Sequence, residues 1–142
     1  MGHGYHRAVL TRIATTAAVV GALAASILAA PALAIENPLS ANVIPIGSGG
    51  VHGAVTFFQL GSNVNVGLNL DNDTPGTAAV DLRKGTCKNY AQNSRWPLGT
   101  FNGSSQETRL PNTKLESLMG QVLLVHKTQS VDSPVIGCAE IH

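Results

Sequence analysis

The stretch Asn63–Leu70, which reads Asn-Val-Asn-Val-Gly-Leu-Asn-Leu, decides the class of this fold. Apolar residues alternate with asparagine or glycine, and successive side chains of a β-strand point to opposite faces. The pattern therefore predicts a strand with one face on a hydrophobic core and the other face in solvent. Gly61-Ser62 before the strand and Asp71–Gly76 after it are rich in turn-forming residues, so a turn is expected at each end.

Further strands are expected on both sides of this segment. β-branched and aromatic runs with alternating polarity predict strands over 51–60, 77–83, 105–110, 121–127 and 135–141, and an edge strand near 42–46. The polar stretch Lys88–Arg95 has no strong period, and Trp96-Pro97-Leu98 and Phe101 supply isolated apolar residues. In Phe57-Phe58, one ring is expected in the core and the other at the surface, where it is available to a partner.

One short helical turn is expected between two of these strands. Thr113 and Glu116 have the spacing of a capping box, and Leu115, Leu118 and Met119 fall on one helical face. Gly120 follows at the position where a left-handed terminator is favoured. Many short strands with glycine-rich turns and a single helical turn predict an all-β Greek-key sandwich or barrel.

The N-terminus has the features of a secretory signal peptide. Arg7 and Arg12 precede an apolar, alanine-rich stretch, and Ala32-Leu33-Ala34 fits the small-residue rule of signal peptidase. We therefore expect cleavage after Ala34 and not an uncleaved membrane anchor, and a protein that is secreted or associated with the cell envelope. The expected organisation is a signal peptide over 1–34, an extended N-terminal lead-in over 35–50 and one β domain over 51–142.

The composition of the mature chain argues against several classes of partner. Removing 34 of the 142 residues leaves 108, with seven Lys and Arg against eight Asp and Glu, a net charge of −1. This near-neutral charge offers no electrostatic footprint for nucleic acid or for an anionic membrane. Cys87 and Cys138 are the two cysteines, and in an exported chain they are expected to form one disulfide.

The order of several landmarks resembles that of secreted bacterial proteins related to copper/zinc superoxide dismutase. The resemblance covers roughly Val51–Ile141 and is carried by an ordered set: Thr74-Pro75-Gly76, Gly85-Thr86-Cys87, Trp96-Pro97-Leu98, the residues from Leu115 to Met119, Leu124-Val125-His126-Lys127, and the segment from Ser133 to Ile141. The resemblance implies the dismutase β fold, and it implies the Cys87–Cys138 bond independently of the cysteine count.

The departures from that family concern its metal ligands. Where the family has His-x-His, this chain has Asp81-Leu82-Arg83, and the segment Lys88–Gly103, which corresponds to the zinc loop, contains no histidine. Arg83 cannot ligate a cation, so an ion pair between Asp81 and Arg83 is expected in place of the lost ligands, worth about 0–1 kcal/mol if exposed. His126 alone stands at a copper-ligand position, which makes it a weak metal candidate.

These observations predict an exported superoxide dismutase-like domain without enzymatic activity and without a cofactor. Its role would be structural or binding, with an unidentified protein or cell-envelope partner, and no membrane contact after signal removal. The alternative is a weak copper-binding or residual superoxide/redox protein that uses His126. A third possibility is a secreted inhibitor or adhesion module that binds through a loop surface.

Overall fold

The structure is a computed structural model, and it describes residues 37–71, 76–93, 96–102 and 105–142. The expected signal peptide and the Thr74-Pro75 part of the predicted turn lie outside these residues. No helix within the described ranges is long and apolar enough to cross a membrane. The described residues all belong to one compact unit that spans 32–142.

The described residues form one curled antiparallel sheet. Hydrogen-bonded neighbours follow the order β5-β4-β8-β9-β1-β2-β3-β7. β4 also pairs with β6 through residues 77–82, whereas it pairs with β5 through residues 85–86. Consecutive strands β3 and β4 are therefore separated in the sheet, as are β7 and β8, which is the crossing pattern of a Greek key. The strands are β1 (Leu39–Pro45), β2 (Gly53–Leu60), β3 (Asn63–Leu70), β4 (Thr77–Thr86), β5 (Asn89–Tyr90), β6 (Trp96–Asn102), β7 (Ser105–Leu110), β8 (Gln121–His126) and β9 (Val135–Ile141).

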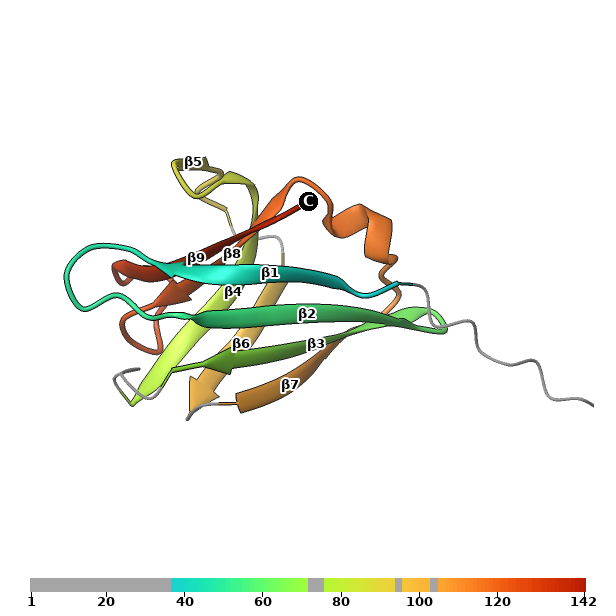
Figure 1. The fold of residues 1–142 in the computed structure, drawn as a ribbon, viewed down its shortest axis with the longest axis horizontal. Helices are drawn as coiled ribbons and strands as arrows, with labels where there is room; N and C mark the ends of the chain where they lie inside the picture. The colour runs from blue at the N-terminus through green and yellow to red at the C-terminus, as the bar shows by residue number, and fades with distance from the viewer. Residues whose placement is uncertain (1–36, 72–75, 94–95, 103–104) are drawn as a thin grey trace, which may run out of the picture. The chain divides into compact units, whose positions relative to one another are not determined.

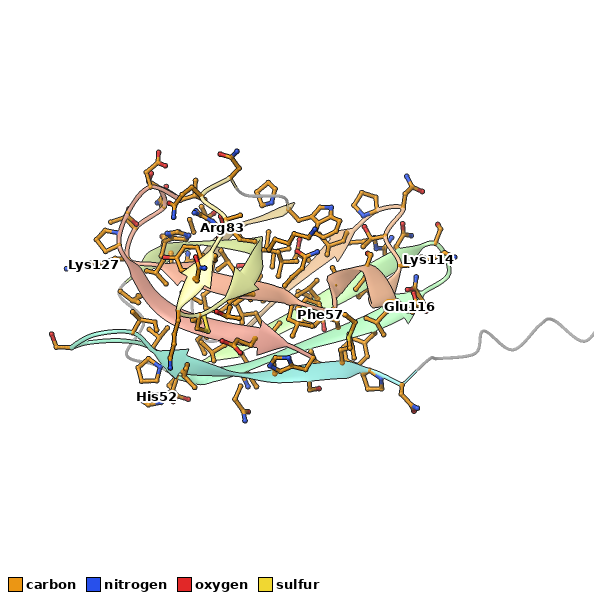
Figure 2. All side chains as sticks on the ribbon, turned by 90° about the horizontal axis from the view of Figure 1, so that it is seen from above. His52, Phe57, Arg83, Lys114, Glu116 and Lys127 are labelled. Atoms are coloured by element: carbon orange, nitrogen blue, oxygen red, sulfur yellow. A yellow bond between two sulfur atoms is a disulfide. The ribbon has the colours of Figure 1, made fainter. Side chains whose placement is uncertain are left out.

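The sheet curls into two layers with the hydrophobic core between them. Figure 1 shows β1, β2, β3 and β7 running together as one layer, which β4, β6, β8 and β9 cross obliquely. Phe57 is fully buried and lies in the middle of the molecule in Figure 2. The apolar side chains of Asn63–Leu70 are buried as predicted, and so are Ala78, Val80 and Leu82 on β4.

Most strands lie where the sequence places them. β3, β7 and β9 have the expected bounds, β4 extends three residues further, and the all-β class with one disulfide is confirmed. The prediction for Phe57-Phe58 is also confirmed, since Phe57 is buried while Phe58 is 40% exposed on the outer face of β2. Alternation was a reliable guide here because each of these strands has one face on the core.

One prediction about strands is wrong, and two strands are not predicted by the sequence. The segment near 42–46 is not an edge strand, because β1 pairs with β2 over Leu39–Val43 and with β9 over Ile44–Pro45. The region 88–103 contains β6 and the short β5, which the sequence does not reveal. The pairing of β6 with β4 skips one residue between Pro97 and Gly99, and this bulge disrupts the alternation by which strands are recognised.

The predicted helical turn is present, but its expected cap is not. Leu115–Leu118 form a single 3₁₀ turn, and the Thr113 hydroxyl donates to the Pro111 carbonyl instead of forming a capping box. The Leu115 amide donates to Gln59 Oε1 on β2 at 2.7 Å. With three residues per turn, Leu115 and Leu118 share the buried side whereas Met119 is 50% exposed. Gly120 has the expected positive φ of 72°.

Candidate functional site

Asp81 and Arg83 lie on the outer face of β4, opposite the core residues Val80 and Leu82. Both are nevertheless buried, with 0% and 5% of their surface exposed. Two loops contribute to this burial, because Arg83 donates to the Gln92 carbonyl at 2.9 Å and to the Val131 carbonyl at 3.1 Å. The loop after β5 and the loop between β8 and β9 are thus both tied to one guanidinium group.

The expected ion pair between Asp81 and Arg83 exists, but its setting differs from the expectation of an exposed pair. Arg83 Nε lies 2.9 Å from Asp81 Oδ2, and neither side chain is more than 7% exposed. His126, at the end of β8, places Nε2 3.1 Å from the other carboxylate oxygen, Oδ1. Asp81, Arg83 and His126 therefore form one buried ionic network, whose energetics follow the rules for buried charges and not those for surface pairs.

The hydrogen bonds of His126 require a proton on both ring nitrogens. Nδ1 lies 2.9 Å from the Ser133 carbonyl, and Nε2 faces the Asp81 carboxylate. A carbonyl and an ionised carboxylate only accept hydrogen bonds, so both nitrogens must donate. Burial by itself lowers the pKa of His126, but the hydrogen bonds to Asp81 and Ser133 and the charge of Asp81 outweigh it and raise the pKa above its ordinary 6.5.

The same contacts favour the ionised form of Asp81. Burial by itself raises the pKa of a carboxyl group, because it penalises the charged form. Hydrogen bonds from His126 and Arg83, together with their positive charges, outweigh that effect and hold the pKa of Asp81 below its ordinary 3.8. When His126 is protonated, the network thus contains one negative and two positive charges.

We expect the stability of the protein to fall as the pH rises from about 6.5 through the raised pKa of His126. A raised pKa in the folded state means that protonated His126 stabilises the fold fully below its unfolded pKa, and that this contribution is lost as the proton leaves. Asp81 affects the acidic end of the pH range: ionised Asp81 stabilises the fold, and this contribution is lost as the pH falls through its lowered pKa. The measurement is the free energy of unfolding in urea from pH 5 to pH 9.

Two histidine variants test whether His126 causes the loss of stability above pH 6.5. His126→Asn is expected to abolish the decline above pH 6.5, whereas His52→Asn is expected to keep it, because His52 is exposed in the loop between β1 and β2. An alkaline slope that survives unchanged in His126→Asn would show that another group causes it.

The disulfide lies beside this network on the same outer side of the sheet. Cys87 follows β4 directly and bonds to Cys138 on β9, although β8 runs between the two strands. Cys138 is fully buried in a small second cluster with Val122 and Leu124. The Cys87 amide donates to Glu140 Oε1 at 2.9 Å, which holds the segment after β4 against β9. The pairing expected from the cysteine count and from the resemblance is confirmed.

Several partners in the network have no signal in the sequence. The carbonyls of Gln92, Val131 and Ser133 accept its hydrogen bonds, and any residue type supplies such a group. Tyr90 places its ring 5.6 Å from the Arg83 guanidinium carbon, a cation–π contact. Among these partners only Tyr90 contributes its side chain, so its aromatic ring is the only one of these features that the sequence displays.

The side chains of this region do not fit a copper or zinc ion. Within the described ranges, no group of three or more His, Cys, Asp or Glu side chains is arranged to hold a metal. Both nitrogens of His126 are engaged, and the Arg83 charge beside Asp81 repels a cation. His142 lies apart from the network, exposed at the C-terminus, with Nε2 3.4 Å from Glu140 Oε2.

Comparison of the chain with protein-family models found no match, and comparison with curated proteins found none either. The dismutase-like resemblance therefore stays a prediction from the ordered sequence landmarks.

Proposed function

We propose that this chain is an exported, non-enzymatic superoxide dismutase-like domain with a structural or binding role at the cell envelope or outside the cell. The observation that supports it best is the buried network of Asp81, Arg83 and His126. In the related enzymes this place is expected to hold copper ligands, whereas here hydrogen bonds within the protein satisfy its polar groups.

The contacts of His126 argue against redox chemistry at this site. A metal ligand must offer an unprotonated ring nitrogen, and here each nitrogen carries a proton that is donated to an acceptor. One imidazole also gives no chelate, and dismutation requires a copper ion that cycles between two oxidation states. Copper binding by Asp81 and His126 would require Arg83 to leave the carboxylate first.

The disulfide supports the proposed location. Disulfides form and persist in oxidising compartments, and the Cys87–Cys138 bond is compatible with a secreted protein. The network and the disulfide both hold loops and strands together. We therefore propose that the region corresponding to the metal site has a structural role, and that the domain functions through another part of its surface.

The experiment is the copper and zinc content of residues 35–142 after incubation with both metals and desalting. We expect less than about a tenth of an equivalent, because metal binding must displace the proton from one ring nitrogen of His126, break its hydrogen bond and separate Asp81 from Arg83. His126→Ala is measured beside the wild-type protein. Near one equivalent of copper that is lost in the variant would contradict the proposal and establish the copper-binding alternative.

A further inference from the structure

The sheet has an open edge at β7. Over its whole length β7 pairs with β3, from Ser105 opposite Asn69 to Leu110 opposite Val64, and within the described residues it has no other strand partner. β6 is likewise paired only with β4. β6 lies beside β7 without pairing with it in the described part of the chain, and the two strands border a small apolar hollow. The hollow is lined by Val66, Leu68, Val80, Leu98, Gly99, Thr100, Phe101, Gln106 and Thr108.

Thr108 lies at the midpoint of β7 and is partly exposed. Thr108 lines the apolar hollow, and it also lines a shallow depression on the outer face together with Asn65, Glu107 and Arg109. An unpaired strand edge offers its N–H and C=O groups to another strand. A strand added here would extend the sheet and cover part of the apolar hollow.

The charges on this edge are self-complementary. Glu107 and Arg109 are both exposed and flank Thr108 on the outer face. If two copies of β7 pair antiparallel about a two-fold axis at Thr108, Glu107 of each copy lies opposite Arg109 of the other. Arg109 uses Nε to donate to Asn65 Oδ1 at 3.2 Å, which leaves its terminal nitrogens for a carboxylate. Opposite charges directly across a strand pair stabilise it, whereas like charges destabilise it.

We propose that the β7 edge is a self-association site, at which two copies of this chain pair β7 with β7 antiparallel about Thr108. The interface is isologous, with the same patch contributed by each copy, as in most homodimers. A charged edge usually serves to prevent pairing, but the alternation of one acidic and one basic residue makes this edge complementary to itself. The inference goes beyond the proposed function and does not depend on it, because neither Glu107 nor Arg109 is a hydrogen-bond partner in the network of Asp81, Arg83 and His126.

The test is sedimentation equilibrium of the purified mature chain and its charge-reversal variants over a wide concentration range. We expect the wild type to populate a dimer in the micromolar to millimolar range that is usual for small interfaces. Glu107→Arg and Arg109→Glu, each alone, are expected to weaken the dimer about tenfold or more, because each places two like-charged pairs across the strands. The double variant Glu107→Arg/Arg109→Glu is expected to dimerise again.

Mixing the two single variants gives the sharpest outcome. Glu107→Arg carries two positive charges on the edge and Arg109→Glu carries two negative ones, so the mixture is expected to form a heterodimer that neither variant forms alone. Lys114→Glu and Glu116→Arg are matched controls, since these exposed residues have the same spacing but lie at the 3₁₀ turn (Figure 2). A monomeric wild type up to about 1 mM, or a dimer that both single variants retain, would overturn the proposal.

Discussion

Replacing Asp81 by alanine is expected to lower the free energy of unfolding by about 3–5 kcal/mol, as is typical when one partner of a buried ion pair is removed. The substitution leaves Arg83 and His126 as two buried positive charges without a counterion. His126 can respond by losing its proton, but Arg83 cannot, so its uncompensated charge causes most of the loss. The measurement is urea unfolding at pH 7, with the midpoint and the slope fitted together.

Two further variants show whether the charge itself is responsible. Asp132→Ala removes an exposed carboxylate from the loop between β8 and β9, and it is expected to change the stability by less than about 0.5 kcal/mol. Replacing Asp81, Arg83 and His126 together by leucine removes all three charges, and it is expected to recover most of the stability that Asp81→Ala loses. A loss below about 1 kcal/mol in Asp81→Ala would mean that water reaches and screens the network.

The parts of the fold that the sequence predicts well are those where one periodicity dominates. Asn63–Leu70 alternates strictly and forms β3 with the predicted bounds. β6 cannot be recognised in this way, because Pro97 and Gly99 interrupt the alternation of apolar and polar residues. A bulge between these two residues also changes which side chains face the core. β1 differs from the expected edge strand for another reason: Pro45 lies at the strand's last position, opposite Gly137 of β9, so the strand is paired on both sides.

The candidate site shows the same division between local and long-range information. The pairing of Asp81 with Arg83 was predictable, because residues two apart in a strand share a face. Its burial was not, because that depends on loops at Gln92 and Val131 folding over the outer face. The inclusion of His126 depends on β8 lying beside β4, a neighbour relation that no local pattern encodes.

The network and the disulfide together explain how a small domain holds its loops against the outer face of the sheet. Arg83 fixes two loops by hydrogen bonds to the carbonyls of Gln92 and Val131, and His126 fixes the end of the β8–β9 loop at Ser133. The covalent bond then joins the end of β4 to β9 across β8. The hydrogen bonds of the network fix the orientation of the loops, because each donor has one acceptor. The disulfide acts differently, since it restricts the conformations of the unfolded chain.

Removing the disulfide is the second change with a large expected effect. Cys87 and Cys138 are 51 positions apart, and for a loop of that length the chain-entropy model gives about 4 kcal/mol of stabilisation. The variant Cys87→Ala/Cys138→Ala is therefore expected to lose about this amount. Domains of this size have a total stability of about 5–15 kcal/mol, so the variant should be only marginally folded at 37 °C.

Comparison with the chemically reduced wild-type protein separates the cross-link from packing. Cys138 is fully buried against Val122 and Leu124, so alanine at this position also leaves a small cavity, which reduction does not. The reduced protein is expected to unfold at a lower urea concentration than the oxidised protein, with the alanine variant at or below it. If complete reduction, verified by thiol titration, left the unfolding midpoint unchanged, the cross-link would not stabilise this fold. The Asp81–Arg83–His126 network would then be the main link between β4 and the loops that cover it.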